Sequence, residues 1–378
     1  MEDAPRRIFT PGTGAMPPAL TGREREQAVL SRCLADLLGG ASPPHDVVLT
    51  GPRGNGKTVL LNWFERACRD HGTDVDVMNL TPDDIPTRDA FIAVLSPPSG
   101  LAKLLPRKIG VAAVGSVEWA PPPGGVRNLP AKLTARCRRR PLAVLLDEAH
   151  TLDIDVGRML LNASQRVRAD APFMLVLAGT PGLAAHLAAM DASFWSRLGE
   201  GRLGIGLLGD AAARAALAEP LAAHGGGIDA DALATVVDES QRYPYFVQLW
   251  GAALWERHPV TGATRLTAAH VDAARSDVAG QITDCYQDRR RELETRGLLP
   301  AAMATAPLFQ AGGTASDHAV DAALATTGAD ASARVAAREE LHALGYIWSP
   351  PGQRPPVVWI AGIPSLTTYV LDHARQTP

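Results

Sequence analysis

The chain has 378 residues, of which 46% are hydrophobic, so we expect a folded protein of two or three domains and not a single core. A formal net charge of −3 gives no overall attraction to nucleic acid, and any DNA contact would need a local basic surface. The four cysteines lack metal-ligand spacing and no apolar run reaches about 18 residues, which argues against structural zinc and membrane insertion and favours a cytoplasmic protein.

The first half of the chain alternates strand and helix patterns. Residues 1–19, rich in Pro and Gly, are predicted to be a flexible arm. Residues 96–130 carry an apolar segment between Pro and Gly residues and are compatible with a hairpin or a partner surface. Short apolar runs bounded by turns predict four strands, with helical spacing of apolar residues between them. The strands are expected at residues 46–50, 75–80, 142–146 and 173–178. This alternation predicts a doubly wound, parallel α/β sheet over residues 20–208.

From about residue 209 the strand patterns stop. Helical patterns over residues 209–285 predict a helical lid. Residues 286–378 continue with helical patterns and end in two short extended pieces around a turn at Pro351 and Gly352. That order resembles a winged-helix domain, so we expect an α/β core, then a lid, then a carboxy-terminal winged helix.

The strongest chemical signal lies between the first strand and the helix that follows it. This stretch satisfies GxxxxGK[ST] in the strand–turn–helix context that a phosphate-binding P-loop requires. Glycines let main-chain amides face the phosphates, Lys57 would reach the β- and γ-phosphates, and the Thr58 hydroxyl would coordinate Mg²⁺. The predicted nucleotide-binding residues here are Gly51, Pro52, Arg53, Gly54, Asn55, Gly56, Lys57 and Thr58. An ordinary glycine-rich turn is a poor alternative, because a chance match is rare in a chain of this length.

Two further signals follow apolar runs that are predicted to end at the same edge of the sheet. In LAVLLDEAH, Asp147 is expected to hold Mg²⁺, and Glu148 to orient and deprotonate the attacking water. In LVLAGTPGL, Thr180 is expected to touch the γ-phosphate or that water. Either signal alone would be an ordinary solvated loop or turn. The phosphate-binding loop upstream favours the catalytic interpretation.

With these motifs the chain resembles the AAA+ and related STAND-type P-loop ATPases, near their origin-recognition-like and transposition-associated members. The resemblance spans about residues 20–285 and rests on LTGREREQAVL, GPRGNGKT, VLLDEAH, LVLAGTPGL and SFWSRLGEGRLGIGLL. It implies ATP and Mg²⁺ as ligands. It also implies that the stretch containing Thr21, Gly22 and Arg23 lines the adenine pocket.

The resemblance further implies a homo-oligomer in which Arg197 reaches the nucleotide of a neighbouring subunit as an arginine finger, with Arg202 as the second candidate. A solvated loop is the alternative role for both arginines. One departure concerns the lid, where Tyr245 stands at the place of the usual sensor arginine. Tyr243 and Pro244 instead resemble the proline motif with which STAND-type ATPases pack against the bound base. No NKxD motif is present, which favours ATP over GTP.

Three groups of arginines offer candidate surfaces for nucleic acid. Arg334 and Arg338 lie four residues apart in the predicted recognition helix, and Arg354 lies at the predicted wing tip. Residues 136–140 carry four arginines without compensating acids, whereas the three consecutive arginines at 289–291 lie beside Asp288, Glu292 and Glu294, as is typical of solvated helix faces. The carboxy-terminal domain is therefore expected to meet either DNA or a protein partner.

Three functions are compatible with these residues. The first is an ATPase that hydrolyses ATP to drive conformational change or assembly, alone or on DNA. The second is a STAND-like nucleotide switch with slow turnover, whose winged-helix region binds a protein partner. The third is a nucleotide-binding scaffold, against which Glu148 argues because a scaffold needs no water-orienting carboxylate.

Overall fold

The computed structural model describes residues 8–12, 14–72, 74–95, 129–261, 265–351 and 357–374. The chain divides into two units. The sheet unit contains Arg25–Thr50 and Leu60–Gly204, and the lid unit contains Met1–Glu24, Gly51–Val59 and Ile205–Pro378. The phosphate-binding loop therefore packs with the lid unit, although it directly follows a strand of the sheet unit.

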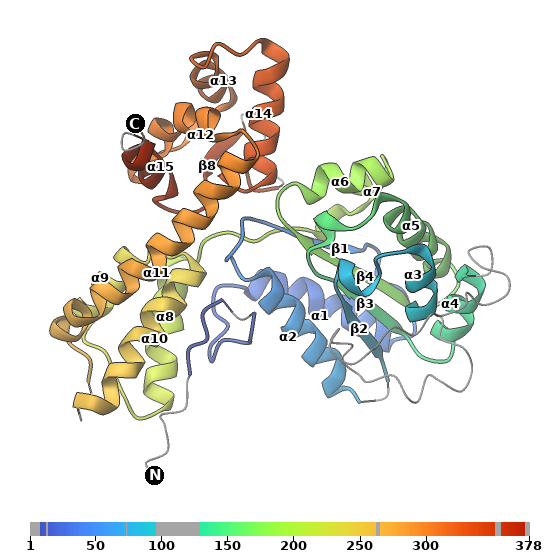
Figure 1. Cartoon of the computed structure of the whole chain (residues 1–378). Coiled ribbons are helices and arrows are strands. Elements are labelled where there is room, and N and C mark those ends of the chain that lie inside the picture. The colour runs from blue at the N-terminus through green and yellow to red at the C-terminus, as the bar shows by residue number, and fades with distance from the viewer. Residues whose placement is uncertain are drawn as a thin grey trace. The chain divides into compact units, whose positions relative to one another are not determined.

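The sheet unit is built on five parallel strands in the order β2-β3-β4-β1-β5 (Figure 1). Every residue of β1, β3 and β4 is buried, because these central strands are covered on both faces and, apart from Thr50 at the end of β1, carry no polar side chain. The strands are β1 (Val47–Thr50), β2 (Asp76–Leu80), β3 (Leu142–Leu146), β4 (Phe173–Gly179) and β5 (Arg202–Gly204). The predicted parallel α/β sheet is confirmed, and β5 is a fifth strand that the sequence patterns did not indicate.

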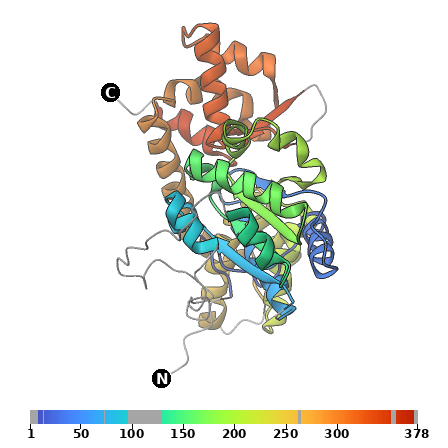
Figure 2. The same ribbon diagram turned by 90° about the vertical axis from the view of Figure 1, so that its right-hand side faces the viewer.

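Helices cover both faces of this sheet. Right-handed crossovers place α2 on one face and α3, α4 and α5 on the other, as Figures 1 and 2 show. Helix α5 starts where the Asp153 carboxylate accepts hydrogen bonds from the amides of Asp155 and Val156, both at 3.0 Å. The helices are α1 (Glu24–Leu38), α2 (Lys57–Asp70), α3 (Arg88–Leu95), α4 (Leu129–Cys137), α5 (Ile154–Arg168), α6 (Leu183–Met190) and α7 (Phe194–Arg197).

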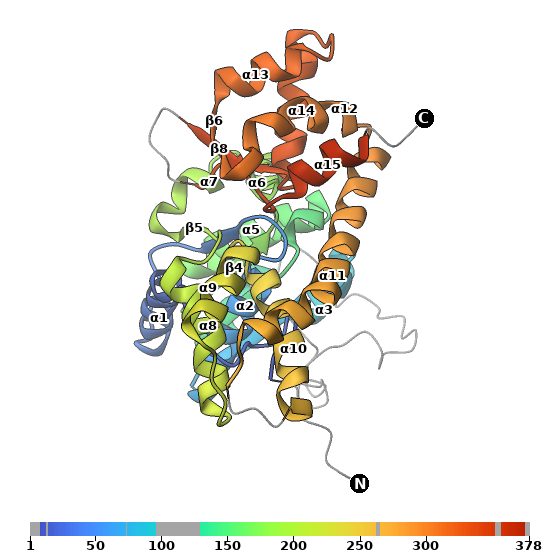
Figure 3. The same cartoon turned by 90° about the vertical axis from the view of Figure 1, so that its left-hand side faces the viewer.

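In the part of the lid unit that follows β5 in the chain, four helices surround a core that includes Tyr243, Phe246 and Trp250 (Figure 3). They are α8 (Asp210–Ala223), α9 (Ala230–Glu239), α10 (Pro244–Thr261) and α11 (Ala268–Thr295). Helix α11 is 28 residues long and continues through the boundary predicted at residue 285. The lid and the carboxy-terminal region are thus joined by one continuous helix and share one hydrophobic core.

The carboxy-terminal module, residues 298–374, combines helices with a three-stranded antiparallel sheet in the order β6-β8-β7. Its two short strands β7 and β8 and its helices α13 and α14 lie where the sequence patterns indicated, whereas the predicted wing tip at Arg354 lies outside the described residues. The elements are α12 (Leu299–Thr305), β6 (Ala315–Ser316), α13 (Asp317–Ala325), α14 (Ala331–Ala343), β7 (Ile347–Trp348), β8 (Val358–Ala361) and α15 (Leu366–Ala374).

The amino-terminal segment differs from expectation. Ile8 and Phe9, within the predicted flexible arm, are buried in the core of the lid unit. A Cβ atom added to Gly251 of α10 would overlap the Phe9 ring, so the glycine makes room for the aromatic side chain. This part of the arm is anchored, because burying two apolar side chains outweighs the entropy of a free segment. Among the described residues, no helix is long and apolar enough to cross a membrane.

Candidate functional site

The P-loop, Gly51–Thr58, has the backbone that a phosphate cradle requires. Gly54 and Gly56 adopt φ values of 77° and 91°, in the left-handed region that favours glycine. A Cβ atom on Gly51 would overlap the carbonyl oxygen of Ile205, whereas one on Gly56 would meet no heavy atom within 4 Å. Gly54 thus supplies the left-handed backbone of the turn, and Gly51 allows its close approach to Ile205. Gly56 leaves open space beside the loop.

Lys57, the first residue of α2, closes the loop on itself. Its Nζ donates hydrogen bonds to the carbonyl oxygens of Gly51 at 2.8 Å and Pro52 at 2.9 Å, and the residue is only 6% exposed. A buried ammonium inside a ring of main-chain groups, at the start of a helix, is suited to an anionic ligand. Asn55 is 1% exposed, and neither polar atom of its side chain has a hydrogen-bond partner among the described residues. The loop therefore fits a phosphate chain.

Two side chains of the lid unit brace this loop from outside. The Tyr243 hydroxyl donates a hydrogen bond to the Arg53 carbonyl oxygen and packs directly on Gly54. Burial raises the pKa of Tyr243 well above its usual value, so the phenol remains a donor. The Arg23 guanidinium donates to the carbonyl oxygens of Asn55 at 3.1 Å and Gly206 at 2.6 Å. Both residues were predicted to bind nucleotide, and both contact the loop's main chain.

The remaining predicted nucleotide-binding residues also belong to the lid unit. Thr21 donates through its hydroxyl to the Ala212 carbonyl oxygen of α8 at 2.7 Å. Gly22 has a φ of 69°, and a Cβ atom there would lie 2.6 Å from the Cβ of Ala212. Pro244 begins α10, directly after Tyr243. The structure therefore brings the residue 21–23 stretch, the P-loop and the Tyr243–Pro244 pair together, whereas the position of the adenine base remains a prediction.

The acidic residues lie at the carboxyl edge of the sheet unit. Asp147 directly follows β3, its amide donates to the Leu80 carbonyl oxygen at 2.9 Å, and its Oδ1 accepts from the Glu148 amide at 2.9 Å. Asp147 is 9% exposed, whereas the Glu148 side chain is 48% exposed and its backbone has a left-handed φ of 50°. Because parallel strands end at the same edge of a sheet, Asp147 after β3 and Thr180 after β4 lie at one edge of the sheet unit.

Sequence reasoning missed His150, which connects two of these residues. Its Nδ1 lies 3.4 Å from Glu148 Oε2 and 3.4 Å from the amide nitrogen of Thr180. Thr180 is only 4% exposed. The signal was present in the sequence, because His150 completes DEAH one turn after Asp147.

Arg197, the predicted finger, is paired within its own unit. Its guanidinium lies 2.7 Å from Asp191 Oδ2, bonds the Ser193 hydroxyl and stands 5.8 Å from the centre of the Phe194 ring. Hydrogen bonding from Arg197 lowers the pKa of Asp191 to about 2. The structure therefore engages Arg197 with Asp191 and Ser193 beside it in the sequence. The second candidate, Arg202, lies on β5, 6.0 Å from the Trp195 ring.

The two predicted Mg²⁺ ligands lie in different units, Thr58 in the lid unit and Asp147 in the sheet unit. A hydroxyl and a carboxylate are hard oxygen ligands of the kind that Mg²⁺ prefers. The described residues contain no cluster of three or more His, Cys, Asp or Glu side chains that could hold a metal by themselves. Mg²⁺ that arrives with a nucleotide takes most of its ligands from phosphate and water, so two protein oxygens are enough.

Most arginines of the three candidate nucleic-acid surfaces form ion pairs with acidic residues. Arg136 and Arg140 both pair with Asp76 of β2, at 3.5 Å and 2.6 Å, so the expectation that residues 136–140 lack compensating acids is wrong. Arg334 pairs with Asp321 and Arg338 with Asp317, both on α13. The three arginines at 289–291 pair within α11, with Glu292, Glu294 and Asp288. Neutral pairs attract phosphate less than free cations do.

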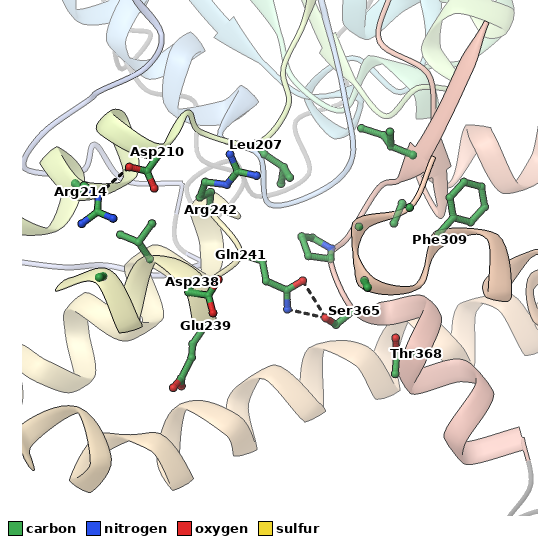
Figure 4. A pocket seen from close by; sticks show the side chains of 18 residues that line it. Leu207, Asp210, Arg214, Asp238, Glu239, Gln241, Arg242, Phe309, Ser365 and Thr368 are labelled. Atoms are coloured by element: carbon green, nitrogen blue, oxygen red, sulfur yellow. Dashed lines mark hydrogen bonds and ion pairs between the residues drawn. The ribbon is translucent and has the colours of Figure 1, made fainter. Parts of the chain in front are cut away.

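A separate cavity of about 830 Å³ lies between lid helices and the carboxy-terminal module (Figure 4). Gln241 and Ser365 face each other there and form hydrogen bonds of 2.6 Å and 2.9 Å. Both residues have left-handed φ values, 51° and 57°. Arg242 also lines this cavity, whereas none of the predicted nucleotide-binding residues does.

Comparison with known proteins agrees with these motifs. Residues 19–177 match the family described as AAA ATPase domain. An ORC1-type DNA replication protein of Methanothermobacter thermautotrophicus is 24% identical over 151 residues, which make up 40% of this chain and 35% of that protein. The match thus spans about a third of that relative's length.

Two solved structures share the fold of nearly the whole chain. A Walker-type ATPase of Pyrococcus abyssi has a TM-score of 0.60 at 15% identity and covers 93% of this chain and 96% of its own. Cdc6p of Pyrobaculum aerophilum has a TM-score of 0.50 at 16% identity, covering 97% and 98%. The predicted resemblance to AAA+ P-loop ATPases of the origin-recognition-like group is confirmed.

Proposed function

We propose that the chain binds Mg·ATP at residues 51–58 and hydrolyses it, a function supported by the match of residues 19–177 to the AAA ATPase domain family. The observation that carries the proposal is the buried Lys57 ammonium, held 2.8 Å and 2.9 Å from two carbonyl oxygens of the same loop. A cation enclosed in this way, in a loop that leaves open space at Gly56, is prepared for the β- and γ-phosphates.

The remaining roles follow from the chemistry of each group. Thr58 and Asp147 would hold Mg²⁺, which neutralises charge on the phosphates. Glu148, half-exposed beside the sheet edge, would orient the attacking water and accept its proton, with Thr180 contacting the water or the γ-phosphate. Thr21, Gly22, Arg23 and the Tyr243–Pro244 pair would shape the adenine pocket.

Two substitutions separate binding from turnover. Lys57→Ala should weaken Mg·ATP binding by about 100-fold, because two or more charge-assisted hydrogen bonds of about 1.5–3 kcal/mol each are lost. Glu148→Gln should bind Mg·ATP like the parent and lower kcat by about 100-fold or more. Isothermal titration and phosphate release measure these two effects, with Lys132→Ala on α4 as the matched lysine control. If Glu148→Gln hydrolyses ATP at the rate of the parent, Glu148 is not the general base.

Hydrolysis would be completed by Arg197 from a second subunit. For this role the Arg197 side chain must break its ion pair with Asp191. Because that side chain is 39% exposed and the pair lies at the surface, breaking the pair costs little free energy. Arg197→Ala should therefore lower kcat only at protein concentrations at which the parent is oligomeric. An equal loss in a monomeric preparation would exclude the finger.

A nucleotide switch is the second candidate, and a contact within the lid unit favours it. The P-loop touches not only Tyr243 but also the carboxy-terminal module, since a Cβ atom on Gly362 would lie 3.1 Å from Pro52 Cγ. Arg53 also lies 3.7 Å from Glu292 of α11. A change in the loop on nucleotide binding would therefore reach the helix that leads into the predicted winged-helix domain.

DNA and protein partners are distinguished by one assay on the Glu148→Gln protein. Light scattering after size-exclusion chromatography with Mg·ATP, with and without duplex DNA, follows both assembly and DNA binding. Because Arg334 and Arg338 are neutralised by Asp321 and Asp317, we expect assembly that depends on ATP without a DNA complex. A complex with DNA that weakens steeply with salt would favour assembly on DNA instead.

A further inference from the structure

We propose that His150 is a positioning residue that ties the orientation of the Glu148 carboxylate to the main chain of Thr180. The proposal rests on the proposed function, which assigns Glu148 and Thr180 to the hydrolytic site. Its Nδ1 lies 3.4 Å from Glu148 Oε2 and 3.4 Å from the Thr180 amide nitrogen.

The ring of His150 is held in place from two sides. It belongs to a closed turn, because the amide and the hydroxyl of Thr151 both donate to the Glu148 carbonyl oxygen, at 2.9 Å and 3.0 Å. On the other side it packs against the end of β4, where a Cβ atom on Gly179 would lie 3.1 Å from His150 Nδ1. The His150 side chain is 14% exposed. The position of Nδ1 is thus set by the turn and by the glycine.

The orientation of the Glu148 carboxylate depends on its contact with His150 Nδ1. That carboxylate is half-exposed on a left-handed backbone, and His150 is the only side chain among the described residues that pairs with it. Without such a partner the carboxylate would sample several rotamers, and a misplacement of about 1 Å can cost about 100-fold in rate. The contact therefore restricts the group that must face the water.

One nitrogen cannot serve both neighbours at the same time. When Nδ1 carries the hydrogen it can donate to Glu148, and when the hydrogen is on Nε2 the Nδ1 lone pair can accept from the Thr180 amide. A neutral ring passes between these two states by exchanging tautomers, without a change in charge. A shift of the Thr180 main chain at the end of β4 would thereby change whether His150 donates a hydrogen bond to Glu148.

Asn and Gln at position 150 distinguish this role from packing. The Asn amide falls near the position of Nδ1, whereas the Gln amide falls near that of Nε2. We expect His150→Asn to keep kcat within about threefold of the parent, and His150→Gln and His150→Ala to lower it about tenfold. For all three, KM and the Kd for Mg·ATP should remain within about twofold. Equal losses for Asn and Gln, parent-like rates for all three, or a rise in KM instead of a fall in kcat would overturn the proposal.

A second measurement needs no turnover. In protein with ¹⁵N-labelled histidine rings, His150 is assigned by the resonance that is lost in His150→Asn. Glu148→Gln should shift the His150 Nδ1 resonance, whereas Lys57→Ala should leave it unchanged. An unshifted resonance in Glu148→Gln would overturn the contact. Parent-like hydrolysis by Glu148→Gln would instead count against the proposed base, so the two failures are distinguishable.

Discussion

The residues assigned to binding and those assigned to turnover differ in how firmly the structure holds them. In the lid unit, Lys57, Arg23 and Tyr243 are 6%, 6% and 1% exposed and are bonded to main-chain carbonyl groups. In the sheet unit, the side chains of Glu148 and Arg197 are 48% and 39% exposed and are held by one ion pair each. Binding residues are thus fixed before the ligand arrives, whereas turnover residues can change partner at small cost.

The largest expected effect tests whether the sheet unit has a stability of its own. Asp46 is buried before β1, where it pairs with Arg168 at 2.8 Å and accepts from the Leu175 amide at 3.1 Å. Asp46→Ala should destabilise this unit by about 3–5 kcal/mol, since it leaves the partly buried Arg168 guanidinium and the buried Leu175 amide without the carboxylate that they contact. Hydrogen exchange should show the loss in β1 and β4 but not in α10.

The control for this change is Asp155→Ala in the same unit. Asp155 is 54% exposed and pairs with Arg88 at 2.7 Å, so its removal should cost about 0.2–1 kcal/mol. Equal loss of protection in α10 after Asp46→Ala would mean that the two units unfold together.

A smaller effect is expected at the brace on the P-loop. Tyr243→Phe removes the hydroxyl that donates to Arg53 while it keeps the ring on Gly54. Loss of one such bond, worth about 1 kcal/mol, should weaken Mg·ATP binding by about fivefold. Tyr346→Phe is the matched control, because that hydroxyl donates to the Ala302 carbonyl oxygen at 3.0 Å, inside the carboxy-terminal module. Equal affinities for the two variants would show that the brace does not contribute to binding.

The ion pair that holds Arg197 predicts a pH dependence. The pKa of Asp191 lies at about 2 in the folded chain against 3.8 for the free group, so the stabilisation is complete above pH 3.8 and is lost as pH falls to 2. Asp191→Asn should cost about 0.2–1 kcal/mol at neutral pH, as expected for an exposed pair. Urea unfolding of both proteins should show this difference shrinking below pH 4. A difference that grows on acidification would contradict the assignment.

A further prediction concerns the hydrogen bonds between Gln241 and Ser365. Ser365→Ala removes both contacts beside the cavity and should change stability by less than about 1.5 kcal/mol. If the second candidate function holds and the coupling runs through this contact, hydrogen exchange of α15 should become less sensitive to Mg·ATP in this variant than in the parent. A response of α15 to Mg·ATP equal to that of the parent would count against coupling through this contact.

Local sequence patterns were sufficient to predict the central strands of the sheet and the P-loop. The strands β1, β3 and β4 are continuous apolar runs, and the P-loop is a contiguous motif, so neighbouring residues alone carry that information. The three-residue strand β5 was missed because it is short and pairs only with β1. A glycine-rich stretch of that length has no periodicity to detect.

What the sequence could not show depends on residues far apart in the chain. The burial of Phe9 requires Gly251, and the pairing of Arg136 and Arg140 requires Asp76 on another strand. The packing of the P-loop with the lid unit depends on Arg23 and Tyr243, which stand on opposite sides of it in the sequence. His150 is the exception, since it was visible one turn after Asp147 and was not interpreted.

The most direct test of the account is amide hydrogen exchange of residues 51–58 in the Glu148→Gln protein, with and without Mg·ATP. If the main-chain amides of this loop bind the phosphates, nucleotide should slow their exchange, and Lys57→Ala should abolish that protection. Nucleotide binding that leaves exchange of residues 51–58 unchanged would contradict the central claim.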